Sequence, residues 1–115
     1  MKKLNYSQDY RDKIRLMKKN LDTRFDKEIR LNIFKKIDSR IQSLKQNEDI
    51  GISVKEMFGV ETDYKVIYAA KNYIFYRIEE SNIFIVNIYN EREDFMWKLF
   101  GIRTTSKETE EYWNE

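Results

Sequence analysis

The sequence has 115 residues, 41% of them hydrophobic and 15% aromatic, which is enough for one compact core and one domain. It contains neither cysteine nor histidine, and this excludes disulfides, thiolate nucleophiles, sulfur-ligated zinc sites and the Ser-His-Asp triad. The net charge of +2 is unevenly distributed, because residues 1–45 hold 14 Lys and Arg against 6 Asp and Glu, whereas residues 46–115 hold 8 against 14.

The basic first part of the chain has two interpretations. Long helices often carry charge on a solvated face that meets no partner. A basic helical face also suits contact with nucleic acid or with an acidic protein. Charge alone does not choose between the two.

Two further classes of protein are excluded by what the sequence lacks. Its three glycines, Gly51, Gly59 and Gly101, are far apart, so there is no glycine-rich phosphate loop. No apolar run is long enough for a membrane-spanning helix, and the first residues lack the apolar segment of a signal peptide. We therefore expect a cytoplasmic domain spanning residues 1–115, with no membrane partner, no cofactor and no metal.

The first 46 residues predict a short strand followed by a pair of amphipathic helices. Residues 2–6 suit a strand, and Ser7 is placed to cap a helix of about three turns. A connector at residues 20–22 then leads to a second helix, which Thr23 caps with Asp26 three residues later and which ends near Gln46. Two helices joined by a short turn form an antiparallel hairpin.

Each predicted helix carries an apolar stripe with helical spacing, and we expect both stripes to face the core. The stripe of the first helix consists of Tyr10, Ile14, Met17 and Leu21. The stripe of the second helix consists of Ile29, Ile33, Ile37, Ile41 and Leu44, widened by Phe34.

From Gly51 onwards the composition changes to one typical of strands. Segments rich in Ile, Val, Tyr and Phe predict strands at residues 52–58, 64–70, 73–78 and 83–89. Asp94 is placed to cap a short helix over residues 95–100 that Gly101 ends, and Thr105 or Ser106 to cap a last turn through residues 112–113. The order predicts an α+β domain, in which an N-terminal strand and an α-helical hairpin pack on a small antiparallel β-sheet, with a short C-terminal helix.

Residues 64–100 carry a resemblance to a known superfamily. The aromatic segment 73–78 contains the pair Tyr76-Arg77, and the apolar segment 83–89 is followed by Arg92-Glu93-Asp94. This succession of an aromatic-Tyr-Arg strand, a short turn, an apolar strand and an Arg-x-Asp resembles the RelE/ParE superfamily of toxins from type II toxin–antitoxin systems. The helical hairpin before it matches in pattern only.

The resemblance implies a growth inhibitor, associated with plasmid stabilisation, whose partner is a cognate antitoxin. RelE-like members are ribosome-dependent mRNA endonucleases with a cluster of basic residues and a tyrosine on the sheet. Such a cluster can do acid–base work and stabilise a pentacovalent phosphate without metal or histidine. ParE-like members lack most of the cluster and inhibit DNA gyrase.

The residues that match the nuclease cluster are Arg92, Arg77, Lys65 and Tyr73. Lys65 fits one of the two alternating lysines of RelE, but Ile67 or Val66 occupies the position of the other, and Tyr73 or Ile74 replaces an arginine. The broken cluster favours the ParE-like interpretation.

The two arginines also have plainer interpretations. Arg92 suits either a functional site or an ion pair with Glu91 or Asp94. Arg77 alternates with Tyr76, so if Tyr76 faces the helices, Arg77 lies on the open face of the sheet, as a site residue or as an ordinary surface arginine.

A dense apolar cluster near the C-terminus is the predicted antitoxin-binding site. Its residues are Phe95, Trp97, Leu99 and Phe100. They suit either a cover for the sheet or a groove for an antitoxin helix or strand.

The sequence therefore predicts a ParE-like toxin that inhibits DNA gyrase. The alternative is a RelE-like mRNA endonuclease that acts at the ribosome. A third hypothesis is a small domain with basic helices that has a structural or RNA-chaperone role.

Overall fold

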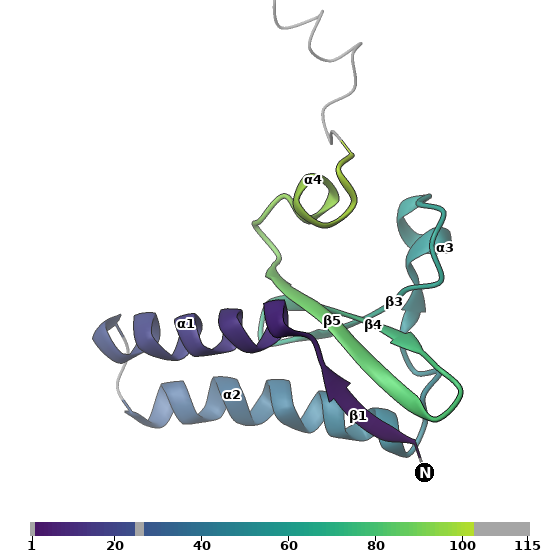
Figure 1. Ribbon diagram of the computed structural model, residues 1–115. Coiled ribbons are helices and arrows are strands. Elements are labelled where there is room, and N and C mark those ends of the chain that lie inside the picture. Colours follow the sequence, from purple (N-terminus) through teal and green to yellow (C-terminus); the bar gives the residue numbers. More distant parts are fainter. Residues whose placement is uncertain (1, 25–26, 103–115) are drawn as a thin grey trace, which may run out of the picture.

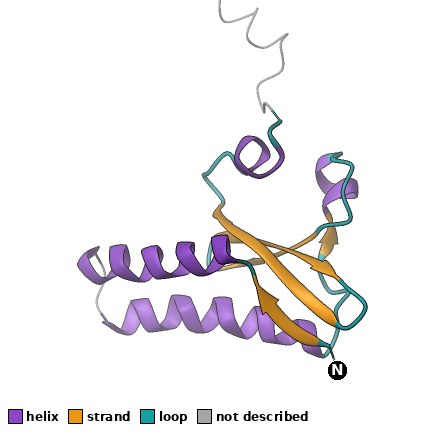
Figure 2. Ribbon diagram, viewed as in Figure 1, coloured by secondary structure: helices purple, strands orange, loops and turns teal. Residues whose placement is uncertain are grey.

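The computed structural model describes residues 2–24 and 27–102, which form an α+β fold of the predicted class (Figure 1). Five strands make one sheet in the order β1-β5-β4-β3-β2. Figure 2 shows the helices α1 and α2 side by side along one side of the sheet, with the shorter α3 and α4 standing apart from them. Within the described ranges, no helix is both long and apolar enough to cross a bilayer.

Strand β1 (Lys3–Tyr6) leads into helix α1 (Gln8–Arg24), and Ser7 caps this helix as predicted. The backbone N–H of Tyr10 donates to the Ser7 hydroxyl oxygen over 3.0 Å. The predicted connector at residues 20–22 is wrong, because α1 continues through Arg24, and Thr23 therefore lies inside α1 instead of capping the second helix. Asn20 and Asp22 weaken a helix by only a few tenths of a kcal/mol each, and no glycine or proline stops it there.

Helix α2 (Lys27–Gln42) continues into a 3₁₀ turn (Ser43–Lys45) and supplies much of the core. Ile37, Ile41 and Leu44 are fully buried, as their spacing predicts. Ile29 is an exception, since 45% of it is exposed. Figure 1 shows why: the ends of α1 and α2 nearest their connection project beyond the sheet, so the stripe continues past the surface that would cover it.

The segment predicted as a strand over residues 52–58 is mostly helical. Strand β2 spans only Ile52–Ser53, and helix α3 spans Val54–Phe58. Ser53 caps α3 by accepting from the backbone N–H of Glu56 (3.3 Å), and Gly59 ends it in the left-handed conformation at φ 73°. The cap at Ser53 satisfies a backbone N–H group in the first turn of α3, which would otherwise lack a partner in a helix. These local signals outweigh the strand-like composition.

The remaining strands agree with the prediction to within two residues. They are β3 (Lys65–Ala69), β4 (Asn72–Ile78) and β5 (Asn82–Asn90). Strand β4 pairs antiparallel with β3 on one side and with β5 on the other. Ala70 and Lys71 both have positive φ, as the tight primed turns of hairpins require. Val86 is an extra residue in β5, because Phe75 pairs with Asn87 while Tyr76 pairs with Ile85.

The prediction of a purely antiparallel sheet is wrong at one edge, where β1 lies. It pairs with β5 in parallel, with Lys3 opposite Asn82 and Tyr6 opposite Ile85, so the sheet is mixed and not purely antiparallel. The helical hairpin between β1 and the rest of the sheet acts as the long crossover that parallel pairing needs.

The sheet separates two hydrophobic clusters. The helix-side cluster lies between the sheet and α1–α2 and includes Ile41, Ile74 and Tyr76. The aromatic cluster lies on the opposite face, under α3 and α4 (Phe95–Phe100), and includes Phe75, Tyr89 and Phe95. Tyr76 therefore faces the helices. Both faces of the sheet are buried against helices.

Gly51 is required for a close approach to Tyr76. A Cβ atom at position 51 would lie 2.5 Å from the Tyr76 hydroxyl oxygen, 2.7 Å from its Cε1 and 2.9 Å from the Val66 carbonyl oxygen. The ring of Tyr76 is completely buried, so it cannot move aside cheaply.

Gly51→Ala is therefore expected to lower the free energy of unfolding by about 1–3 kcal/mol. Urea denaturation followed by circular dichroism measures the change. Gly59→Ala is no suitable control, because its φ is positive, whereas Ser81→Ala changes an exposed turn residue and should stay near wild type. A Gly51→Ala variant as stable as wild type would show that Tyr76 is not held in place.

Helix α4 begins and ends where the sequence predicts. The Asp94 carboxylate accepts from the backbone N–H of Trp97 (3.1 Å), and Gly101 follows the last helical residue. The predicted last turn, with Thr105 or Ser106 as its cap, lies outside the described residues.

Candidate functional site

Lys65 lies on the helix side of the sheet. It alternates with Val66 of the aromatic cluster and pairs across the strands with Tyr76. Its side chain is about a quarter exposed (27%), and Nζ lies 3.9 Å from the Asp49 carboxylate. Lys65 is therefore separated by the sheet from any group on the opposite face.

Arg77 lies on the opposite face, as its alternation with Tyr76 predicts, but this face is not the open one expected, because it also carries the aromatic cluster under α3 and α4. Its guanidinium is 3.7 Å from the Asp63 carboxylate and 3.9 Å from that of Glu79. Its Nε atom is buried and makes no hydrogen bond within the described part of the chain. Two carboxylates thus offset the positive charge that phosphate recognition would use.

Arg92 follows the end of β5 and is exposed. Its backbone N–H donates to the Asn90 side chain (3.0 Å), which closes the turn after the strand. Its two predicted ion-pair partners have other contacts, because Glu91 accepts from the Tyr68 hydroxyl (2.6 Å) and Asp94 caps α4. The hydrogen bond to Glu91 raises the pKa of Tyr68.

Arg77 and Arg92 lie toward opposite ends of the β4–β5 pair. Arg77 is opposite Phe84, whereas Asn90, the last residue before the turn that holds Arg92, is opposite Asn72. The five steps from residue 72 to residue 77 span roughly 16 Å of strand. The two arginines cannot converge on one phosphate in this conformation.

Tyr73 is part of the aromatic cluster. Its ring centroid lies 5.4 Å from that of Tyr68 and 5.2 Å from that of Phe95, with Phe58 edge-on at 6.3 Å. These are ordinary distances for packed aromatic pairs. Tyr73 thus contacts other rings, and none of the three basic candidates is among those contacts.

The predicted antitoxin-binding residues divide between core and surface. Phe95 is 9% exposed and packs on Phe75, with ring centroids 5.4 Å apart. Leu99 and Phe100 are half-buried at the margin of the aromatic cluster. Trp97 projects outward and is 55% exposed. The cluster therefore covers the sheet, and it also presents one large aromatic side chain to solvent.

Comparison with known proteins depends on structure, because no protein-family model matches the sequence and no curated protein matches it significantly. A solved structure described as "Chromosomal ParDE TA system from P. aeruginosa" is similar, with a TM-score of 0.64 and 14% sequence identity. The similarity covers 78% of this chain and 96% of the matched chain. The chain has a ParE-like toxin fold.

Sequence reasoning missed one partly buried charge in this ParE-like fold. Lys13 of α1 reaches across the end of the sheet, with Nζ 3.2 Å from the Tyr89 ring centroid and 3.1 Å from the Ile88 carbonyl oxygen, to which it donates. Burial lowers the pKa of Lys13 to about 8, although both contacts favour the charged form. Its position three residues after Tyr10 and four before Met17 could have indicated that it faces the core.

The ParE-like fold of this chain also shows no acidic metal site within the part that the structure describes. There, no three or more carboxylate side chains are grouped closely enough to hold a metal ion.

Proposed function

We propose that this chain is a single-domain toxin of a type II toxin–antitoxin pair, active in the cytoplasm and neutralised by a cognate antitoxin. The support is twofold. The segment from residue 64 to residue 100 resembles the RelE/ParE superfamily, and the fold is ParE-like. The similar solved structure is itself described as a toxin–antitoxin system.

We further propose that the toxin acts by binding and inhibiting DNA gyrase, in the ParE-like manner. The observation that carries this proposal is the separation of the basic candidates. Lys65 is on the helix side of the sheet, Arg77 is offset by two carboxylates, and Arg92 lies toward the far end of the strand pair. Metal-free cleavage of RNA needs several such groups preorganised around one phosphate.

The antitoxin contact is proposed on the outer surface of α4. Trp97 is exposed there, and the half-buried Leu99 and Phe100 adjoin it. Exposed tryptophans beside a partly covered apolar surface are frequent anchors of protein–protein interfaces. Phe95 supports this surface from the core and does not contact a partner directly.

Expression of the chain alone from a tightly controlled promoter is expected to arrest growth while messages stay intact. Mapping the 5′ ends of several transcripts soon after induction measures cleavage. The purified chain should then inhibit supercoiling by gyrase in a reconstituted assay. Arg92→Ala should leave the growth arrest unchanged, as should the matched surface variant Lys35→Ala.

A different result would favour the RelE-like endonuclease. New 5′ ends within translated codons, absent from the Arg92→Ala strain and present in the Lys35→Ala strain, would contradict gyrase inhibition and establish Arg92 as a catalytic residue. Normal growth with the chain expressed would instead contradict the toxin assignment and favour a structural or RNA-chaperone role.

A further inference from the structure

A cavity lies where the helical hairpin meets one end of the sheet. It has a volume of about 640 Å³ and is bounded by α1, α2, the turn from β3 to β4 and the end of β5. Its apolar walls are aliphatic and consist of Leu16, Met17, Ile33, Ala70 and Ile88. Cavities of this size with mostly apolar walls are typical of sites for small molecules. We call this space the end cavity.

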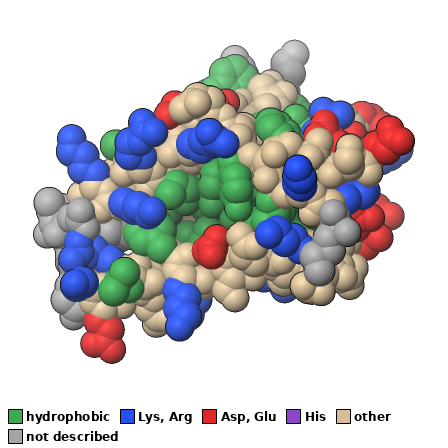
Figure 3. Space-filling view, turned by 60° about the horizontal axis from the view of Figure 1, so that its bottom comes forward, with side chains coloured by type: hydrophobic (Ala, Val, Ile, Leu, Met, Phe, Trp, Pro, Cys, Tyr) green, Lys and Arg blue, Asp and Glu red, His purple; other side chains and the backbone are tan. Residues whose placement is uncertain are grey.

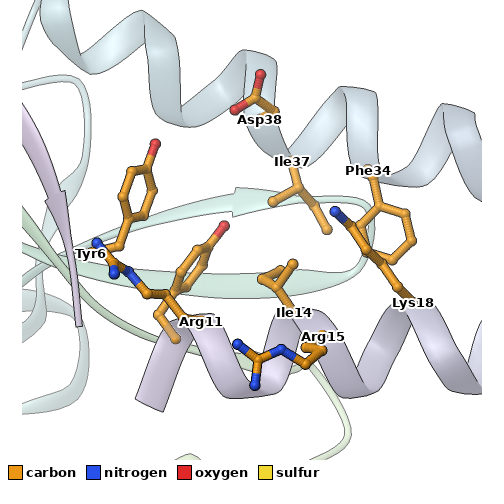
Figure 4. Close-up of a pocket in the computed structure, with 9 residues that line it drawn as sticks. Tyr6, Arg11, Ile14, Arg15, Lys18, Phe34, Ile37 and Asp38 are labelled. Carbon is orange, nitrogen blue, oxygen red and sulfur yellow. The ribbon is translucent and has the colours of Figure 1, made fainter. Parts of the chain in front are cut away.

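Lys13 differs from the neighbouring cations of α1. Arg11 and Arg15 line a separate groove, shown in Figure 4, and both are exposed. Figure 3 likewise shows Lys and Arg side chains reaching the surface around a band of apolar side chains. Lys13 is partly buried and lines the end cavity instead. Its Nζ is held 3.1 Å from the Ile88 carbonyl oxygen and 3.2 Å from the centroid of the Tyr89 ring.

The charge of Lys13 meets no carboxylate at ion-pair distance in the described part of the chain. Glu93 also lines the cavity, but one of its oxygens is 3.8 Å from Lys98 Nζ and the other accepts from the Asn90 backbone N–H (3.2 Å). Burial lowers the pKa of Lys13 to about 8, and the negative charges of Glu93 and Asp9 counteract this only in part. A negative charge placed inside the cavity would therefore be stabilised.

We propose that the end cavity binds a small aliphatic monocarboxylate, whose carboxylate pairs with Lys13 and whose chain packs on Leu16 and Ile33. Two lysines, Lys13 and Lys71, and one glutamate, Glu93, line the cavity, which gives its walls a net charge of +1. One carboxylate neutralises that charge, and its hydrogen bond to the ammonium group is charge-assisted. The proposal concerns a different surface from α4 and does not depend on the gyrase target.

A nucleotide fits the end cavity less well. A phosphate monoester carries about two negative charges near neutral pH, which exceeds the net charge of the walls, and Glu93 would repel it. A base would stack on flat aromatic rings. Among the described residues, no aromatic side chain lines this cavity.

Three ligands of equal chain length test the proposal. They are octanoate, its neutral isostere octanamide and the cation octylamine, each titrated into the ¹⁵N-labelled full chain at pH 7, where Lys13 is charged. Amide signals of Lys13, Met17 and Ile88 should shift in two-dimensional nuclear magnetic resonance spectra. Octanoate should bind about tenfold or more tightly than either of the other ligands, because only octanoate forms the charged hydrogen bond.

Lys13→Met removes the charge and keeps an apolar side chain of similar length. Octanoate should then bind about tenfold more weakly, at the level of octanamide, while octanamide binding stays as in wild type. The matched control is Lys19→Met, an exposed lysine of α1 that does not line the cavity, and it should keep the preference for octanoate. Leu16→Glu is a second test, because Leu16 lines the cavity and is 58% exposed, so the change leaves the core intact. It should also weaken octanoate binding about tenfold or more.

Circular dichroism checks that each variant is folded, and if Lys13→Met is not, Leu16→Glu decides. Equal binding of octanoate and octanamide to wild type would overturn the proposal, as would shifts confined to residues outside the cavity. An equal loss of octanoate binding in Lys19→Met would show that only the overall charge matters, and would overturn it too. Displacement of octanoate by a lower concentration of adenosine monophosphate would overturn it in favour of a nucleotide.

Discussion

Replacing Phe75 with alanine is expected to lower the free energy of unfolding by about 3–5 kcal/mol. Phe75 is completely buried at the centre of the aromatic cluster. Its ring centroid lies 5.4 Å from that of Phe95 and 6.0 Å from those of Tyr89 and Phe100. The cavity left by the ring would be lined by three other rings that cannot collapse into it. A loss of this size is a large part of the total stability of a small domain.

Urea unfolding followed by far-ultraviolet circular dichroism measures this change. Trp97→Ala is the matched control, because it removes a larger aromatic side chain from the same region, one that is 55% exposed. The control should cost less than about 1 kcal/mol. If Phe75→Ala and Trp97→Ala had equal effects, the aromatic cluster would not be a core, and α4 would not be a cover for the sheet.

Tyr76→Phe is expected to cost about 1–3 kcal/mol at neutral pH. The Tyr76 hydroxyl donates to the Glu48 carbonyl oxygen (2.7 Å) and accepts from the Gly51 backbone N–H (3.0 Å). Phenylalanine keeps the ring and its packing but leaves both backbone groups without this partner. The cost therefore reports the two hydrogen bonds and not the volume of the side chain.

The same variant should change the response to alkaline pH. Burial raises the pKa of Tyr76 from 10.0 to about 12, so the folded state favours the neutral phenol. That contribution is complete below pH 10 and is lost as the pH rises from 10 to 12, by an amount on the order of 2–3 kcal/mol. The advantage of wild type over Tyr76→Phe should therefore shrink across this range.

The comparison between the two proteins at each pH removes the effect of other groups. Burial also raises the pKa of Tyr10, which lowers stability above pH 10 in both proteins. The lowered pKa of Lys13 acts in the other direction, because stability rises from pH 8 to 10.5 as the unfolded chain holds that proton longer. Parallel stability curves for wild type and Tyr76→Phe from pH 8 to 11 would show that Tyr76 titrates normally.

The sequence predicted those elements whose signals are local. Asp94 and Gly101 mark the two ends of α4, and Ser7 marks the start of α1. For α3, the cap signals were present in Ser53 and Glu56, but the composition of residues 52–58 as a whole led to the prediction of a strand. The parallel pairing of β1 could not be predicted, because its partner β5 lies about 79 residues away and no local pattern specifies that contact.

In the candidate site too, features with a local sequence signal were predicted, and features that depend on contacts between distant segments were not. The opposite directions of Tyr76 and Arg77 follow from strand alternation alone. The separation of Arg77 from Arg92 depends on the pairing register of β4 and β5, and the ion pair of Arg77 with Asp63 joins two segments that the sequence does not align. The partial burial of Lys13 depends on where the Tyr89 ring lies in the folded chain, which the spacing of residues along α1 does not give.

The parallel contact between β1 and β5 also orders events during synthesis. The first strand leaves the ribosome long before its partner, and until β5 follows, Leu4 and Tyr6 have no sheet on which to pack. Contacts between such distant residues form slowly, because a long loop must close before they are made. The chain must therefore be translated at least as far as β5 before the helix-side cluster can assemble, and any surface that requires the finished sheet becomes available only after that point.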